Sequence, residues 1–173
     1  LIEDICARKD KKANILYRIT PGIKADSHDY IITGKKDSKF GMPQDEEELY
    51  NEVKRAIDSP YVEFLGFHFH IGSQLFDKEP YIQALNVTLN HIKNIKDRYD
   101  FDIKEINMGG GFGVTYTDEK RKPYSYFLDP LMDRVREFYQ EENAKLPALV
   151  IEPGRSIVAE AGISLYTVGR IKN

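Results

Sequence analysis

The sequence holds a single cysteine among 173 residues, and it lacks both long hydrophobic runs and an excess of basic charge. Because Cys6 has no partner, an internal disulfide is excluded, which fits a reducing compartment. No apolar run approaches the roughly 20 residues that a membrane-spanning helix needs. With 25 Lys and Arg against 28 Asp and Glu, the net charge of −3 offers no basic field for nucleic acid. We therefore expect neither a membrane nor nucleic acid as a partner.

Both ends of the sequence have the pattern of secondary structure. Residue 1 is Leu, residues 1–5 have a helical pattern, and no signal peptide is visible. Residues 163–173 are rich in β-branched and aromatic side chains, which favour a strand. We expect the chain to be a segment of a longer polypeptide.

Strand and helix patterns alternate between these ends. Strands are predicted over residues 15–19, 62–70, 103–108 and 149–151, and helices over residues 44–58, 81–98 and around Leu131, Val135 and Phe138. Repeated strand–helix order implies parallel strands with helical crossovers. A doubly wound sheet and about half of a (β/α)8 barrel both fit this order.

Polar residues and glycines fall at or just beyond the C-terminal ends of these strands. They are Arg18, His70, Gly109–Gly111 and Glu152. A barrel gathers all such ends around one mouth, where its active site lies. An open sheet offers a crevice between only two of them. Their distribution therefore favours the barrel.

Gly109–Gly111 and Gly113 form a glycine cluster after one strand. Consecutive glycines let backbone N–H groups approach an anion without interference from a Cβ atom. A dinucleotide fingerprint would need glycine where Val114 stands, and a Walker loop would need a following Gly-Lys-Ser/Thr. The cluster is interpreted either as an anion site or as a tight turn.

A second cluster, Glu152-Pro153-Gly154-Arg155, follows the next strand. Proline and glycine favour a sharp turn, so Glu152 and Arg155 can both face the mouth. The alternative is a surface ion pair between these two residues, which would contribute little stability.

Histidines and phenylalanines alternate in the third cluster. Strand geometry puts His68 and His70 on one face, with Phe67 and Phe69 on the other. A metal site is not expected, because no third ligand stands at a suitable spacing. His68 is interpreted as a core histidine, whereas Ser73 in the following turn can donate to an anion.

These groups together suit a phosphorylated heteroaromatic cofactor. Glycine N–H groups, Ser73 and Arg155 offer a phosphate site, and His70 offers a flat ring. Glu152 can hold a proton on a ring nitrogen, as pyridoxal phosphate requires to act as an electron sink.

The whole chain resembles the diaminopimelate decarboxylase family of alanine-racemase-like (fold-type III) pyridoxal-phosphate enzymes. Five motifs match in order, namely Tyr17–Gly22, Ser38–Gly41, Gly66–Gln74, Asn107–Gly113 and Ile151–Ser156. The resemblance implies an α/β fold: a partial (β/α)8 TIM barrel, about its second half, over residues 1–160. Residues 161–173 would begin a C-terminal β-domain. It further implies a cytoplasmic homodimeric lyase that uses pyridoxal 5'-phosphate to decarboxylate meso-2,6-diaminopimelate to L-lysine.

The resemblance also assigns roles to residues. His70 matches the histidine that stacks on the pyridoxal ring, and Glu152 matches the carboxylate paired with the pyridine nitrogen. Arg155 matches the residue that contacts the phosphate and the distal carboxylate of the substrate. Arg18 resembles an arginine near the ring on an earlier strand. Lys39–Gly41 resembles a motif near the active-site wall or the dimer contact. The implied cofactor-binding set is Arg18, His70, Ser73, Gly109, Gly110, Gly111, Glu152, Pro153, Gly154 and Arg155.

No catalytic residue is expected within this chain, so we expect it to be inactive by itself. The family's Schiff-base lysine would precede Leu1, and its catalytic cysteine belongs to the C-terminal domain of a partner subunit, a position that Cys6 does not match. Three alternatives stay open: an arginine or ornithine decarboxylase of the same fold, a non-catalytic pyridoxal-phosphate carrier, and a phosphosugar-binding barrel enzyme.

Overall fold

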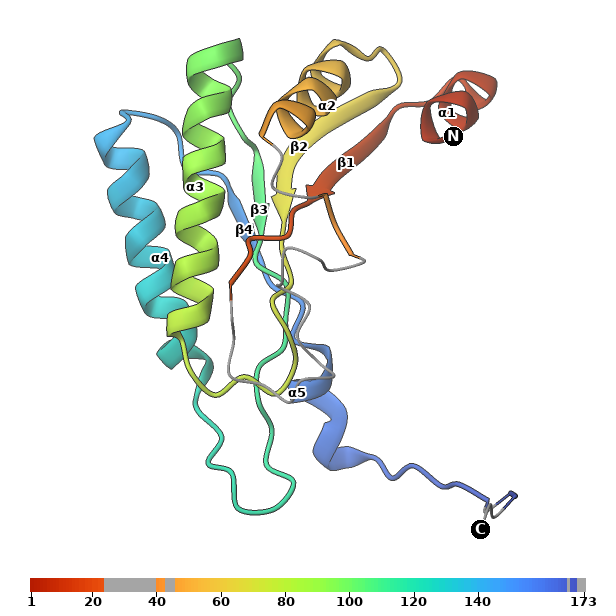
Figure 1. Ribbon diagram of the computed structural model, residues 1–173, viewed down its shortest axis with the longest axis vertical. Helices are drawn as coiled ribbons and strands as arrows, with labels where there is room; N and C mark the ends of the chain where they lie inside the picture. Colours follow the sequence, from red (N-terminus) through yellow and green to blue (C-terminus); the bar gives the residue numbers. More distant parts are fainter. Residues whose placement is uncertain (24–39, 43–45, 168, 171–173) are drawn as a thin grey trace.

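The computed structural model describes residues 1–23, 40–42, 46–167 and 169–170. Figure 1 shows a parallel sheet flanked by helices, with the C-terminal segment leading away from it. Its elements are α1 (Ile2–Lys9), β1 (Ala13–Arg18), α2 (Glu46–Asp58), β2 (Val62–His68), α3 (Glu79–Tyr99), β3 (Glu105–Asn107), α4 (Tyr124–Glu141), β4 (Ala148–Val150), α5 (Gly154–Val158) and a short 3₁₀ helix, Ala159–Ala161.

The four strands lie in sequential order, β1-β2-β3-β4, and every neighbouring pair is parallel. Among the described residues, each crossover carries one helix. Crossovers of one hand in a sheet of sequential order place their helices on a single face, as in a barrel. A doubly wound sheet needs a reversal of strand order, which these strands lack. The predicted α/β fold with a parallel sheet is confirmed.

The core lies between the sheet and helices α2–α4. The apolar stripes that the helical periodicity predicts are buried at Leu49, Val53, Ala56, Leu85, Leu89, Ile92, Ile95, Leu131, Val135 and Phe138. Ile57 and Ile82 of the same stripes are only partly buried. Phe64, Phe67 and Phe69 from β2 and its extension are also buried against this layer. Register shifts by one residue between Ile15 and Leu16, opposite Phe64 and Gly66. This bulge explains why Phe64 and Phe67, three positions apart, share one face.

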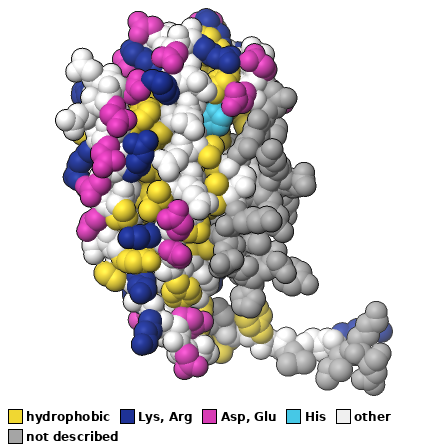
Figure 2. Space-filling view, turned by 60° about the vertical axis from the view of Figure 1, so that its left-hand side comes forward, with side chains coloured by type: hydrophobic (Ala, Val, Ile, Leu, Met, Phe, Trp, Pro, Cys, Tyr) yellow, Lys and Arg dark blue, Asp and Glu magenta, His cyan; other side chains and the backbone are white. Residues whose placement is uncertain are grey.

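The outer surface of the helices is densely and evenly charged (Figure 2). Ion pairs join α3 to residues around it, such as Lys93 to Glu142 and Lys96 to Asp100. Within the described residues, no helix is long and apolar enough to cross a membrane.

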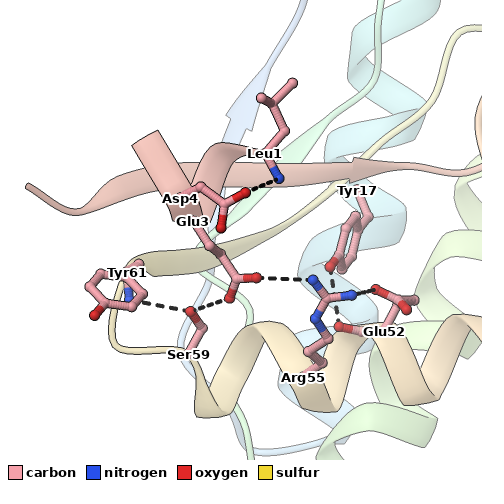
Figure 3. A network of polar contacts seen from close by, with 8 residues as sticks. All are labelled: Leu1, Glu3, Asp4, Tyr17, Glu52, Arg55, Ser59 and Tyr61. Carbon is pink, nitrogen blue, oxygen red and sulfur yellow. Dashed lines mark hydrogen bonds and ion pairs between the residues drawn. The ribbon is translucent and has the colours of Figure 1, made fainter. Parts of the chain in front are cut away.

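Helix α1 is attached to α2 through the carboxylate of Glu3 (Figure 3). Glu3 accepts hydrogen bonds from Arg55 Nη2 at 2.9 Å and from Ser59 Oγ at 2.6 Å. These two donors lower the pKa of Glu3. Tyr17 of β1 donates to the Glu52 carbonyl at 3.1 Å, so the strand joins the same network.

Three expectations need correction. Strand β2 ends at His68 rather than at residue 70, because Arg18 and Asn107, the last residues of both neighbouring strands, lie opposite His68. Strand β3 covers only residues 105–107 of the expected 103–108. The expected C-terminal strand is absent from residues 163–167 and 169–170. Ile163, Leu165 and Tyr166 are each 91% exposed, and a strand forms only where a neighbour completes its hydrogen bonds.

Parts of some predictions lie outside the described residues. These are Ser38 and Lys39 of the second motif, the first residues of the helix expected from residue 44, and residues 168 and 171–173.

Candidate functional site

The segments that follow β2, β3 and β4 continue side by side beyond the sheet. Phe69 N donates to Asn107 O at 3.0 Å, Met108 N to Val150 O at 2.8 Å, and Glu152 N to Gly109 O at 2.8 Å. These bonds bring three of the predicted clusters to one end of the molecule. Backbone hydrogen bonds therefore continue beyond the C-terminal ends of β2, β3 and β4, and they form the base of the site.

The glycine cluster is packed too tightly for any side chain. A Cβ atom on Gly109 would lie 2.3 Å from the Phe69 carbonyl oxygen, and one on Gly110 would lie 2.0 Å from that of Glu152. A Cβ atom on Gly111 would lie 2.1 Å from the Gly72 carbonyl oxygen, and Gly111 has a φ of 101°. All three glycines are thus required by close approach of backbone.

This packing leaves hydrogen-bond donors beside one another. Gly111 touches the Gly72–Ser73 turn, and within the described part of the chain neither the Gly111 N–H nor the Ser73 hydroxyl forms a hydrogen bond. Both residues are partly exposed. Free backbone and hydroxyl donors beside closely packed glycines suit an anion such as phosphate.

Glu152 is held in place by Asn107, the last residue of β3. Asn107 Nδ2 donates to Glu152 Oε1 at 2.9 Å, while Asn107 Oδ1 accepts from Gly109 N at 2.9 Å. Glu152 Oε2 lies 3.8 Å from His68 Nε2. Arg155 forms no ion pair with Glu152 within the described residues, so the alternative of a Glu152–Arg155 surface pair is not what the structure contains.

The two histidines stay neutral in this environment. Burial lowers the pKa of His68, as does Arg18, whereas Glu152 raises it. Burial, Arg18 and His68 lower the pKa of His70, again against an opposing effect of Glu152. Gly110 N donates to His70 Nδ1 at 3.4 Å, which gives that nitrogen the acceptor role of a neutral ring. His68 Nε2 is buried and has no hydrogen-bond partner within the described residues.

Arg18 lies near this centre, and Arg155 contacts Tyr116. Arg18 is paired in register with His68, and its guanidinium lies 5.1 Å from the ring centre of Phe40. Pro153 precedes α5, Gly154 begins it, and the exposed side chain of Arg155 donates to Tyr116 Oη at 3.3 Å. The convergence of Arg155 and Ser73 on one phosphate stays a prediction.

Two residues of the site were not singled out by sequence reasoning. Asn107 stood in a quoted motif without a role, although a polar residue two positions before the glycines was a usable signal. Tyr81 donates to the Gly110 carbonyl oxygen at 3.0 Å, and no local pattern distinguishes it from the apolar residues of its helix.

The residues that are present fit pyridoxal phosphate. The closely packed glycines, with the free Gly111 N–H and Ser73 hydroxyl beside them, suit the phosphate group. The ring of His70 is fixed by Gly110, and the carboxylate of Glu152 is fixed by Asn107. The unpartnered His68 Nε2 faces the same centre.

Comparison with known proteins agrees with this fit. Residues 1–159 match the family described as "Pyridoxal-dependent decarboxylase, pyridoxal binding domain". The chain belongs to this family, which confirms the predicted cofactor.

Relatives of this chain include several diaminopimelate decarboxylases. The enzyme of Bacillus methanolicus is 42% identical over 174 residues, which cover 100% of this chain and 40% of that protein. The enzyme of Bacillus subtilis is 37% identical, over 99% of this chain and 39% of its own length. The crystal structure of diaminopimelate decarboxylase from Helicobacter pylori complexed with L-lysine has a TM-score of 0.79 and 35% identity, covering 91% of this chain and 38% of that one.

These relatives confirm the family resemblance drawn from the motifs. The chain spans about two fifths of the length of the relatives it matches.

Proposed function

We propose that this chain supplies the cofactor-binding part of an enzyme that decarboxylates meso-2,6-diaminopimelate to L-lysine. The observation that carries the proposal is the placement of Glu152, fixed by Asn107 and adjoining the glycine cluster. Relatives that match 99–100% of the chain bear the name of this activity. This similarity favours diaminopimelate over arginine or ornithine as substrate, and catalysis over a carrier role.

Pyridoxal phosphate, when bound, supplies an electron sink for the electrons released as a carboxylate leaves as carbon dioxide. Glu152 holds a proton on the pyridine nitrogen, and His70 stacks on the ring. Gly109–Gly111 and Ser73 bind the phosphate with N–H and hydroxyl donors. In our proposal Arg155 contributes to the phosphate site and binds the distal carboxylate of the substrate.

Arg18, Pro153 and Gly154 complete the proposed set of cofactor-binding residues. Burial and, to a smaller extent, the charge of Arg18 lower the pKa of both His68 and His70, which favours neutral rings at the site. Pro153 and Gly154 form the turn that carries Glu152 into α5, and Gly154 N donates to the Glu152 carbonyl oxygen at 2.9 Å.

The longer enzyme completes the site in this proposal. Residues 1–160 form about the second half of a (β/α)8 barrel, and residues 161–173 begin a C-terminal β-domain. The Schiff-base lysine and the catalytic cysteine come from segments other than this chain, and Cys6 is buried in α1. The enzyme acts as a cytoplasmic homodimer on an amino-acid substrate.

The test is Glu152→Gln in the full-length enzyme. A neutral amide cannot hold the proton on the pyridine nitrogen, so the electron sink weakens more in the transition state than in the ground state. We expect kcat on meso-diaminopimelate to fall by about 10²–10³ while cofactor binding is mostly retained.

Glu160→Gln is the matched control, because it also removes an acidic charge near α5, where Glu160 pairs with Arg121 at 3.6 Å. Its kcat should match that of the wild type. Near-normal turnover of Glu152→Gln would overturn the role of Glu152, and preferred turnover of arginine or ornithine by the wild type would overturn the substrate.

A further inference from the structure

Tyr81 contacts the glycine cluster from the helix layer. It stands in the first turn of α3, is fully buried, and donates from its Oη to the carbonyl oxygen of Gly110 at 3.0 Å. Its Oη would also lie 3.3 Å from a Cβ atom on Gly111. One buried hydroxyl is thus directed at the peptide that joins these two glycines.

The ring of Tyr81 is held on two sides. It stacks on Phe112, the residue after the glycine triplet, with ring centres 5.4 Å apart and planes inclined by 10°. Phe127 of α4 meets the ring edge to face at 5.7 Å. Because this packing fixes the ring, the position of the hydroxyl is fixed as well.

The hydroxyl controls where the next N–H group points. In a trans peptide, the carbonyl oxygen of one residue and the N–H of the next point in opposite directions. With the Gly110 carbonyl oriented toward Tyr81, the Gly111 N–H is directed away from Tyr81. That N–H has no hydrogen-bond acceptor within the described residues. Glycine allows more backbone conformations than other residues. The hydrogen bond from Tyr81 therefore restricts the orientation of the Gly110–Gly111 peptide.

Several backbone groups near this peptide are paired with one another. Leu75 N donates to Gly111 O and Gly113 N donates to Leu75 O, both at 2.9 Å. Burial raises the pKa of Tyr81 far above its usual range, so the phenol remains protonated and remains a donor throughout the physiological range.

We propose that Tyr81 is a positioning residue for the cofactor phosphate. Its hydroxyl orients the Gly110–Gly111 peptide so that the Gly111 N–H, beside Ser73, is presented to the phosphate group. This inference rests on the proposed cofactor site and adds to it a residue that does not touch the cofactor.

The experiment compares Tyr81→Phe with Tyr139→Phe in the full-length protein freed of cofactor. Each change removes one phenolic oxygen from a buried ring. The Tyr139 hydroxyl is buried and has no hydrogen-bond partner within the described residues, which makes it the matched control. Dissociation constants are measured by absorbance for pyridoxal phosphate and for pyridoxal, which lacks the phosphate.

We expect Tyr81→Phe to weaken binding of pyridoxal phosphate by about fivefold to tenfold, the effect of one lost hydrogen bond. Binding of pyridoxal should be unchanged, which also shows that the variant is folded. Tyr139→Phe should change neither constant.

Equal weakening for both ligands would assign Tyr81 a general structural role and overturn the inference, as would no weakening at all. If the wild type itself bound both ligands equally, the proposed phosphate site would fail, and the inference with it. A wild type that prefers the phosphorylated ligand, together with a Tyr81→Phe variant that keeps the same preference, would overturn only the role of Tyr81.

Discussion

Asn107 connects two parts of the candidate site through one amide group. Its carbonyl oxygen accepts from Gly109 N and its amino group donates to Glu152, and the residue is 7% exposed. Because a backbone N–H can only donate, this pairing fixes the amide orientation and directs its NH₂ group at the carboxylate. A single side chain therefore positions both the glycine cluster and the acidic group.

Replacement of Asn107 by leucine in the full-length enzyme tests this connection. The variant keeps a similar volume but loses both hydrogen bonds, at a cost of about 1–3 kcal/mol. We expect kcat per bound cofactor to fall by about 10–100-fold, because Glu152 loses its orientation. Steady-state decarboxylation is the measurement.

Asn86→Leu is the control for Asn107→Leu. Asn86 accepts from Arg134 Nε at 3.0 Å, between α3 and α4 and outside the site. The Asn86→Leu variant should have a lower free energy of unfolding than the wild type and the same kcat. Equal kcat values for the two variants would contradict the role of Asn107.

The loops after β2 and β3 behave as one structural unit. Leu75 and Phe112 form a parallel bridge, and the side chain of Gln74 both donates to Val114 O and accepts from Val114 N. Gln74 has a φ of 59°, a left-handed conformation that a non-glycine residue adopts at a cost of about 1–3 kcal/mol. The two side-chain bonds offset this cost and couple the Ser73 turn to the glycine cluster.

Helices α2 and α3 are joined by a buried polar cluster around His91. Tyr50 Oη lies 3.0 Å from His91 Nδ1 and accepts from Asn94 Nδ2 at 2.8 Å. The Tyr50 hydroxyl has one proton and a second lone pair, so it can pair with His91 Nδ1 in either tautomer of the neutral ring. Burial lowers the pKa of His91, with Glu46 of α2 acting in the opposite direction.

This cluster makes stability depend on pH. Since the folded pKa of His91 lies below its unfolded value of 6.5, the unfolded chain binds the proton more readily. The contribution of His91 is therefore complete above that value and is lost as pH falls below it, by at most about 1.4 kcal/mol per pH unit. The free energy of unfolding, measured with urea between pH 7.5 and 5, should fall in this way as the pH falls. The fall should be smaller in the His91→Gln variant. An identical pH dependence in both proteins would rule out His91 as its source.

The sheet as a whole has two edges without a partner among the described residues. Strand β1 pairs only with β2, and β4 only with β3. A closed barrel has no such edges, because further strands join the first to the last. The Bacillus methanolicus relative is about two and a half times as long as this chain, in keeping with the proposal that these strands are part of a larger barrel.

We expect the 173-residue chain to be inactive alone and to form no single defined lysine adduct with pyridoxal phosphate. The described lysines in ion pairs, such as Lys54, Lys93 and Lys104, pair with surface acids rather than with site residues. Borohydride reduction followed by peptide mass mapping is the measurement, with the full-length enzyme as positive control. One stoichiometric adduct at one lysine of this chain would refute the expectation.

Local pattern was enough to predict the strand–helix order, the apolar stripes of α2–α4 and the clusters at the strand ends. Such patterns depend on residues three or four positions apart in helices and two apart in strands, so neighbours in sequence determine them. The motif order was also sufficient to identify the family and its cofactor.

Packing between distant segments decided the rest. Asn107 meets Glu152 across 45 positions and Tyr81 meets Gly110 across 29, and no local periodicity encodes such contacts. Strand β2 ends where the neighbouring strands β1 and β3 end. Residues 163–167 form no strand despite their strong β-propensity. A strand depends on hydrogen bonds from a second segment, so its existence is a property of the tertiary structure.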